Sequence, residues 1–481
     1  MLLLDKGKQL RFQILQFFLE SDTPTVEIRR IAEQLKVSDY LVKQHLKRLK
    51  EDLADYPEVG IQFEVDEEKK EVLIQRVMPD EVFELSNIYL KNSEEFQLFY
   101  HLLTDPGQPL KHYGQALFLS TSKVYKIKQD LQTRLKPYEL VIDTENRLAG
   151  DELTVRKNLF TFYLKKFHSL AFPFSKKLRH DLRVLVHYIE VELGHPLSEI
   201  ERIKLIYLMS VQYYRIKSGA VIQHFKSFIE VKSDDPILLL IQWFLVTIGC
   251  PAHLIYKESA YVYMFLAVEK FFPVDHSRIH FPDVFEEKSD ELLAWVDEIS
   301  TVPIVAETRM ILFHESMLIN YKYLTYYSKI VDDYRDTFLL NYERSYPHLF
   351  FTVKEYLYNH SSQRVWKFRD QLLMEYIFIF TKYLPPTAYE DTVHVTIDFS
   401  MGEQFNDYIA RSLQSMDNMT IQVTRGADQP CDIYLSDFSP LGARDHAILW
   451  SGPPNEKDWS FLMDTIAAVK KEKYLASKTD S

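Results

Sequence analysis

The feature that most restricts the fold is a short pattern of small and apolar residues that occurs twice near the N-terminus. In the first copy, two amphipathic stretches, 26–35 and 38–53, are separated by only two residues. The small residue Ala32 lies where two helices would cross, and Val37 is placed to fill the turn between them. Ser38 can accept a backbone N–H in the first turn of the next helix. The pattern predicts a tight helix-turn-helix.

Two alternating runs, 59–65 and 72–77, follow and predict a two-stranded wing, so residues 1–78 are expected to form a winged helix-turn-helix. Its last helix would present a cationic face that fits a major groove. The alternative is a charged helical hairpin whose lysines only keep it soluble; the wing and the turn residue favour DNA binding. The expected DNA-binding residues are Ser38, Tyr40, Lys43, Gln44, Lys47 and Arg48.

The second copy occupies 79–164, with helices expected at 94–103, 109–118 and 121–135. Its turn repeats the first, since Leu119 and Ser120 take the places of Val37 and Ser38. Residues 140–142 and 146–148 would form a second short wing. The last helix should expose Lys128 as well as the expected DNA-binding residues Thr121, Lys123, Tyr125 and Lys126.

Charge limits how such a chain would bind DNA. The net charge is −12 and the pI is about 5.8, so attraction to phosphate must come from locally basic helices. Few Arg, Asn or Gln side chains lie on the predicted faces, and these are the residues that read base edges in pairs of hydrogen bonds. We therefore expect double-stranded DNA as the partner, with low sequence specificity, a preference for DNA shape and a steep salt dependence.

Composition predicts a mainly α, multidomain protein. Glycine is scarce, 12 of 481 residues, and 46% of the chain is hydrophobic. Residues from about 165 to 388 have helical periodicity, and a break at 281–288 divides them into two bundles. The apolar run 236–250 is too short to cross a membrane and is expected to be a buried core helix. Asp5, Lys6 and Lys8 interrupt any export sequence, and two distant cysteines fit a reducing cytoplasm.

The last part of the chain changes to strands and helices in alternation. Strands are expected at 394–398, 420–423, 431–436 and 447–450, with helices at 402–413 and 458–471. This order predicts a small, largely parallel sheet flanked by helices.

Further motifs give the chain a resemblance to a known family. The run Arg-Ile-Lys-Ser-Gly at 215–219 and the helix around Glu258 resemble the core helices of a phosphotransferase-system (PTS) regulation domain. With the tandem N-terminal motifs, the whole chain resembles the Mga/AtxA family of Gram-positive virulence and global regulators. The resemblance implies PTS regulation domains at 165–283 and 284–388, a IIB-like domain at 391–476, and a transcription activator that forms a homodimer through this last domain.

In that family, phosphoryl groups delivered to histidines tune activity, because neutral imidazole is a good nucleophile near pH 7. In this chain Leu208 and Phe265 take the two histidine positions of the first regulation domain. His314 and, second to it, His224 are the remaining candidates for phosphorylation. The alternative for each is a histidine that is hydrogen-bonded structurally or simply exposed. The resemblance leaves phosphocarrier proteins of the PTS open as partners.

A working IIB domain carries a cysteine after its first strand, but this chain reads Phe-Ser-Met-Gly at 399–402. Cys431 is expected to be a buried structural residue, so the domain should not transfer phosphate. No enzyme motif, cofactor or metal site is expected; the pair His276 and His280 beside Asp275 is set aside because Pro273 disfavours a helix there. The competing hypothesis is a PTS signalling or scaffold protein that does not bind DNA.

Overall fold

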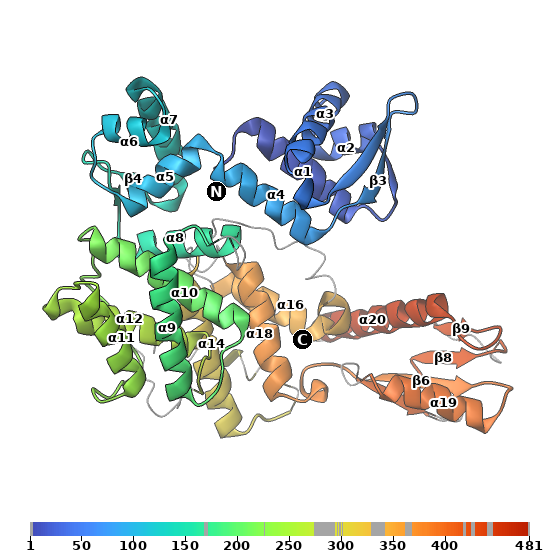
Figure 1. Cartoon of the computed structure of the whole chain (residues 1–481). Coiled ribbons are helices and arrows are strands. Elements are labelled where there is room, and N and C mark those ends of the chain that lie inside the picture. Colours follow the sequence, from blue (N-terminus) through green and yellow to red (C-terminus); the bar gives the residue numbers. More distant parts are fainter. Residues whose placement is uncertain are drawn as a thin grey trace. The chain divides into compact units, whose positions relative to one another are not determined.

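A computed structural model describes residues 3–167, 172–225, 227–273, 294–295, 297, 300, 302–328, 342–360, 368–416, 420–424, 429–439 and 446–479. They are mainly helical, with small sheets near both ends of the chain (Figure 1). The chain divides into two compact units. The first contains Met1–Ser227, Val231–Ala267 and Thr325–Val331; the second contains Phe228–Glu230, Val268–Leu324 and Asp332–Ser481.

The N-terminal segment forms a three-helix head with apolar residues buried at helical spacing. On its third helix Val42, Leu46 and Leu49 are fully buried, which is the face predicted from their spacing. The elements are α1 (Lys6–Glu20), α2 (Ile28–Leu35), α3 (Asp39–Asp55) and the short η1 (Pro57–Val59).

The wing of this head is a three-stranded antiparallel sheet, not the predicted two-stranded one. Its strands are β1 (Thr25–Glu27), β2 (Gln62–Asp66) and β3 (Glu71–Arg76), in the order β1-β3-β2. Val72 of the central strand pairs with Val65 on one side and Val26 on the other. With three residues, β1 is too short for alternation to reveal it.

A second head repeats this arrangement, preceded by a helix, α4, that the sequence pattern did not predict. Its helices are α4 (Pro79–Lys91), α5 (Glu94–Thr104), α6 (Leu110–Leu117) and α7 (Thr121–Leu135), followed by η2 (Lys136–Tyr138). Its wing is a short antiparallel hairpin of β4 (Val141–Ile142) and β5 (Leu148–Ala149). The predicted helices and hairpin of this head are confirmed to within a few residues.

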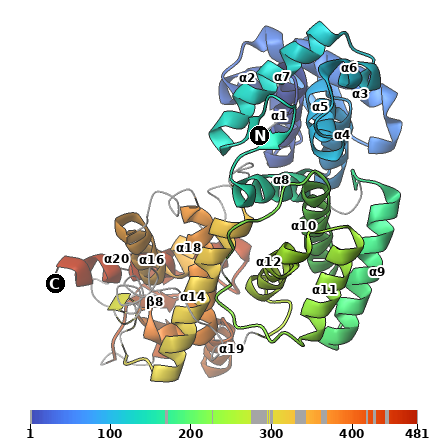
Figure 2. The same ribbon diagram turned by 90° about the vertical axis from the view of Figure 1, so that its left-hand side faces the viewer.

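Helices α8 to α12 complete the described part of the first unit, with α10 among the other four (Figure 2). Helix α10 packs against α8 and α9, and α9 packs against α11. The bounds are α8 (Glu152–Phe167), α9 (Lys176–Leu193), α10 (Glu199–Lys217), α11 (Pro236–Thr247), η3 (Ala252–Leu254) and α12 (Ile255–Val268).

The prediction of a buried core helix at 236–250 holds for the helix and for one of its faces only. Helix α11 buries Ile241 and Leu245 on one face but leaves Trp243 and Val246 more than half exposed on the other. A uniformly apolar run shows no periodicity, so it cannot reveal which face packs. Within the described ranges, every helix is too short or too polar to traverse a lipid bilayer.

A buried ion network ties the second wing to this bundle. Arg156 of α8, 1% exposed, donates through both terminal nitrogens to Glu258 of α12, which is completely buried. Arg156 also donates to Glu152 at 2.7 Å, and Glu152 accepts from Arg215 of α10 at 2.7 Å. Arg215 in turn donates to the backbone oxygen of Leu148 in β5 at 2.8 Å. The network therefore joins α8, α10, α12 and the wing.

The second unit contains further helices and the C-terminal domain. The predicted break at 281–288 lies outside the described residues. Helix α16 packs against α18 and against the last helix, α20. The helices are α14 (Ala306–Tyr326), α16 (Pro347–His360), α18 (Arg369–Tyr383) and the short η5 (Pro386–Ala388).

The chain ends in a four-stranded parallel sheet of order β7-β6-β8-β9, as the strand-helix alternation predicts. Its core consists of buried residues from the strands and both helices, among them Val395, Leu435 and Ile466. Cys431 is exposed and precedes β8, so the prediction that it is buried is wrong. The elements are β6 (Val393–Asp398), α19 (Glu403–Gln414), β7 (Ile421–Thr424), β8 (Ile433–Ser436), β9 (Ala447–Leu449) and α20 (Glu456–Thr479).

Candidate nucleic-acid interface

The turn between α2 and α3 fixes how the first head presents α3. Lys36 ends α2 in the left-handed conformation, with φ 55°, and the amide of Val37 donates back to the carbonyl of Ala32 at 3.0 Å. The hydroxyl of Ser38 accepts the Leu41 amide at 3.3 Å and caps α3. The sequence therefore folds into the helix-turn-helix predicted from this pattern.

The second head uses the same turn. Phe118 ends α6 with φ 56°, and the amide of Leu119 donates to the carbonyl of Gly114 at 2.8 Å. Ser120 caps α7 by accepting the Lys123 amide at 3.3 Å. Two recognition helices, α3 and α7, are thus held by one local geometry.

Gly114 is the tightest point of the second turn and gives a testable prediction. An added Cβ there would lie 2.8 Å from the backbone oxygen of Leu119, a fixed atom in the same turn. Glycine-to-alanine changes inside helices usually stabilise by up to about 1 kcal/mol. Overpacking of this kind costs about 1–3 kcal/mol. We therefore expect Gly114→Ala to lower the free energy of unfolding, measured by urea denaturation.

The control for this change is Gly452→Ala. An added Cβ at Gly452 meets nothing within 4 Å, so stability should stay within experimental error of the wild type. Equal stability of the Gly114→Ala protein would show that the turn relaxes freely.

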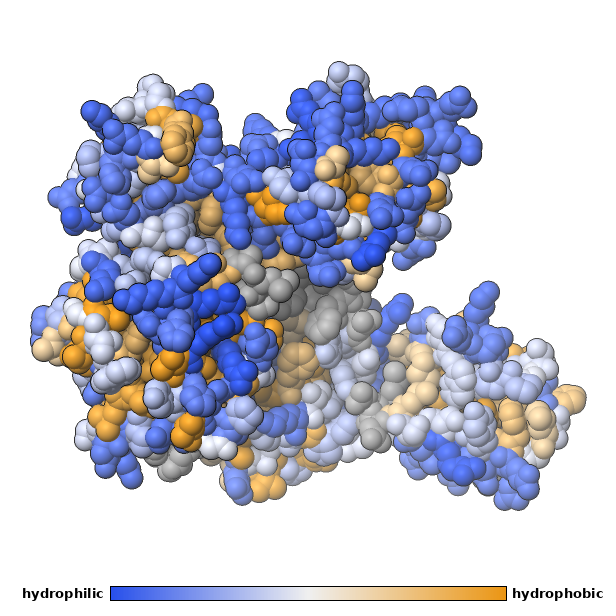
Figure 3. Space-filling view, viewed as in Figure 1, coloured by the Kyte–Doolittle hydropathy of each residue, from blue (hydrophilic) through white to orange (hydrophobic). Residues whose placement is uncertain are grey.

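Helix α3 carries its cations on the face away from the core. Lys47 and Arg48 are exposed, Tyr40 is 75% exposed, and Lys43 and Gln44 are half-buried. The surface over α3 is almost wholly hydrophilic (Figure 3). Lys50 lies over the ring of Phe63 at 5.7 Å, which ties the end of the cationic face to the wing. This face supplies the positive charge that phosphate binding requires.

One acidic residue at the far end of α3, Asp52, is neutralised by contacts with α1 and α4. Asp52 pairs with the Arg11 guanidinium of α1 at 3.0 Å and accepts the hydroxyl of Tyr89 from α4. Burial, followed by the nearby Arg11 and Arg48 charges, lowers the pKa of His45. His45 is therefore neutral at pH 7, and the charge of α3 lies on its exposed face.

Helix α7 is less cationic. Thr121 and Lys126 are exposed and Tyr125 is 53% exposed, but the amide of Gln129 donates to the Tyr125 hydroxyl at 2.9 Å. Lys128 is half-buried, not exposed as predicted, because its ammonium donates to Asn146 at 2.6 Å and supports the wing. The prediction missed this contact because Asn146 lies 18 residues further along the chain.

Each recognition helix has one lysine already paired with a glutamate. Lys43 lies 3.5 Å from Glu67 at the tip of the first wing, and Lys123 pairs with Glu94 at the start of α5. These carboxylates reduce the cationic charge that the helices offer to a phosphate and would repel the DNA backbone. Sequence analysis did not predict either pair.

Removing either carboxylate should strengthen DNA binding. Because exposed ion pairs are worth up to about 1 kcal/mol, we expect Glu67→Gln or Glu94→Gln to raise affinity for a duplex by about two- to fivefold. Fluorescence anisotropy with a labelled fragment measures the change. Glu192→Gln, which removes an exposed carboxylate from α9, should leave affinity unchanged. Weaker binding by both variants would mean that the glutamates position their lysines for DNA.

Comparisons with known proteins match both heads. Residues 10–64 match an HTH domain, and residues 81–163 match the Mga helix-turn-helix domain. The chain is 19% identical over 411 residues to a "putative trans-acting regulator" of Streptococcus pneumoniae serotype 4, covering 79% of this chain and 83% of that protein. These matches support the resemblance of the chain to the Mga/AtxA family of regulators.

A second relative matches a shorter part of the chain. It is the capsule synthesis positive regulator AcpB of Bacillus anthracis, 20% identical over 154 residues. The match spans 32% of this chain and 32% of AcpB, about a third of each.

The two predicted phosphorylation sites lie in different surroundings. His224 is exposed in the loop after α10, whereas His314 lies half-buried on α14 beside the ring of Phe313. Leu208 and Phe265, which the family resemblance predicts at the two histidine positions of the first regulation domain, are buried in the bundle. Both candidates remain predictions. His276, His280 and Asp275 lie outside the described residues.

Proposed function

We propose that this chain is a DNA-binding transcription regulator, an activator by analogy with its relatives, that docks α3 and α7 in the major groove of double-stranded DNA. The observation that carries the proposal is the exposed cationic face of α3, presented by a tight helix-turn-helix and repeated in weaker form on α7. The exposed cations are Lys47, Arg48 and Lys50 on α3 and Lys123 and Lys126 on α7. The matches of both heads to helix-turn-helix domains support the same function.

Low sequence specificity follows from the same surfaces. Ser38 and Ser120 use their hydroxyls as helix caps, Gln44 is half-buried, and Gln129 is engaged by Tyr125. Few groups then remain to read base edges in pairs of hydrogen bonds. Lysine contacts to phosphate, together with the shape and bendability of the site, would select where the protein binds.

A salt series tests this proposal. Affinity of the full-length protein for labelled duplexes of several sequences should fall steeply between about 50 mM and about 200 mM salt, with small differences between sequences. A protein that binds no duplex at the lowest salt would instead be the signalling or scaffold protein of the competing hypothesis. A single tightly bound sequence with a weak salt response would contradict low specificity.

We also propose that the helices from α9 to α12 and from α14 to α18 form two PTS regulation domains. His314 is the leading phosphate acceptor and His224 the second. Phosphotransfer from purified phosphocarrier protein, followed by mass spectrometry of the modified peptides, tests both sites. Modification of neither would mean that PTS control is absent from this family member.

The C-terminal sheet is proposed to be a IIB-like domain that no longer transfers phosphate. The loop after β6 contains no cysteine, and Ser400 donates from its amide and its hydroxyl to Asp437. These hydrogen bonds lower the pKa of Asp437, so a carboxylate lies at the helix-terminal loop where an anion would bind. We propose self-association as the domain's role. Deleting residues 391–481 should then convert a dimer to a monomer in analytical ultracentrifugation; an unchanged dimer would refute this role.

A further inference from the structure

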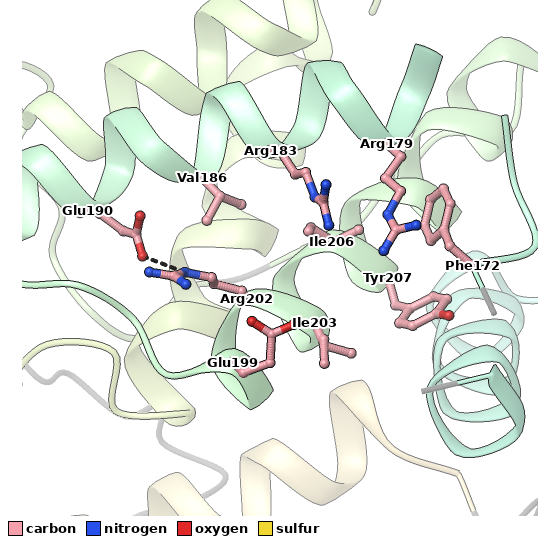
Figure 4. A pocket seen from close by; sticks show the side chains of 10 residues that line it. All are labelled: Phe172, Arg179, Arg183, Val186, Glu190, Glu199, Arg202, Ile203, Ile206 and Tyr207. Carbon is pink, nitrogen blue, oxygen red and sulfur yellow. Dashed lines mark hydrogen bonds and ion pairs between the residues drawn. The ribbon is translucent and has the colours of Figure 1, made fainter. Parts of the chain in front are cut away.

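A cavity of about 300 Å³ lies between α9 and α10 (Figure 4). Val186 of α9 with Ile203 and Ile206 of α10 form its apolar wall, and Phe172 and Tyr207 close one end. These residues recur every three or four positions, so one face of each helix lines the cavity. The volume is at the lower end of the range for small-ligand sites.

Two arginines from α9 reach into this cavity. Arg179 and Arg183 are one turn apart on the same face, and both point toward α10 (Figure 4). Arg179 lies over the ring of Phe172 at 5.6 Å. Within the described part of the chain, no carboxylate is within ion-pair distance of Arg183, which faces the side chain of Ile206. Arg183 therefore places a guanidinium in the cavity that an anion can pair with.

One acidic residue of the cavity wall, Glu190, already accepts hydrogen bonds from two donors. Glu190 accepts the Arg202 guanidinium at 2.7 Å and the backbone amide of Leu197 at 2.9 Å. Burial disfavours its charge, but these two donors outweigh burial and lower the pKa of Glu190. Glu190 therefore stays ionised and bound to Arg202. Glu199, the other acidic residue of the lining, is exposed at the start of α10.

The chemistry of the cavity identifies a ligand class. Guanidinium groups bind phosphate and carboxylate through paired hydrogen bonds. Two guanidiniums one turn apart match the charge of a phosphate monoester, about −1.5 to −2 near pH 7, better than a single-charged carboxylate. The apolar wall offers a contact surface for the organic group of a ligand. We propose that this cavity binds a small organic phosphate monoester, with the phosphate at Arg179 and Arg183 and the organic part against Ile206.

Isothermal titration calorimetry of the full-length protein tests the proposal, with phenyl phosphate, inorganic phosphate and benzoate as ligands. The experiment contains no DNA, so its outcome does not depend on the proposed DNA binding. Phenyl phosphate should bind more tightly than either of the others. Arg183→Gln should weaken its binding by at least about tenfold, since a hydrogen bond to a charged group is worth roughly 1.5–3 kcal/mol.

The matched control is Lys177→Gln, which removes an exposed positive charge from the same helix outside the cavity and should leave binding unchanged. Arg183 is also exposed, so its variant should fold, and far-UV circular dichroism checks this. The proposal would be overturned if both variants weakened binding equally. It would also be overturned if benzoate bound more tightly than phenyl phosphate, or if inorganic phosphate bound as tightly as phenyl phosphate. The absence of binding at millimolar phenyl phosphate would overturn it as well.

Discussion

Replacing Lys43 and Lys47 of α3 by glutamate is expected to weaken duplex binding by about a hundredfold at low ionic strength, because the local charge at the phosphate-facing surface changes by four units. The side chain of Lys43 is 33% exposed and that of Lys47 is exposed, so neither forms part of the core. Fluorescence anisotropy against a salt series measures the loss and should show a flatter salt dependence.

Lys176→Glu with Lys177→Glu is the control for this experiment. It makes the same change in net charge on the exposed first turn of α9, outside both heads. If its binding falls as far as that of the α3 variant, net charge explains the effect and α3 does not. The equivalent change at Lys123 and Lys126 should weaken binding less, because α7 exposes fewer cations than α3. Binding that survives both pairs of reversals would contradict the proposed function.

Replacing Arg156 by methionine should lower the free energy of unfolding by about 3–5 kcal/mol, because Glu258 would be left charged and buried without its partner. Burial alone disfavours the charged guanidinium of Arg156, but Glu258 and Glu152 outweigh burial and raise its pKa. Urea denaturation followed by circular dichroism measures the change, as a shift of the transition that includes the bundle.

Two variants separate the ion network from a general effect of losing an arginine. Arg156→Lys keeps the charge but loses the forked geometry that reaches Glu258, Glu152 and the Ala220 carbonyl together, so it should be intermediate. Arg29→Met breaks an ion pair whose side chains are 76% and 65% exposed and should change stability little. A stable Arg156→Met protein would show that Glu258 finds other donors.

Acid should weaken the same network. The charges of Arg156 and Arg215 overcome the effect of burial and lower the pKa of Glu152 below its usual 4.5. The stabilisation is therefore complete above about pH 4.5 and is lost as the pH falls through the lowered value.

The heads could be predicted closely because their pattern is local. Ala32, Val37 and Ser38 act within a few residues of one another, and the structure confirms the turn, the cap and the buried face of α3. The parallel C-terminal sheet was predictable for a related reason, since alternating strands and helices allow few connections. Strand β1 was missed because three residues are too few to show alternation. Helix α4 was missed although Val82, Leu85 and Tyr89 are buried at helical spacing.

The amino-acid sequence alone determined which segments become helices, where the two tight turns form and which family the chain resembles, because periodicity, capping and turn residues act over a few positions. Tertiary structure alone decided which charges remain available. It placed Glu67 and Glu94 against the recognition lysines, buried Arg156 with Glu258, directed Lys128 to the wing, and brought Arg179 and Arg183 over an apolar wall. Electrostatic attraction depends on distance in space, and the partners in these contacts lie on elements that only folding brings together.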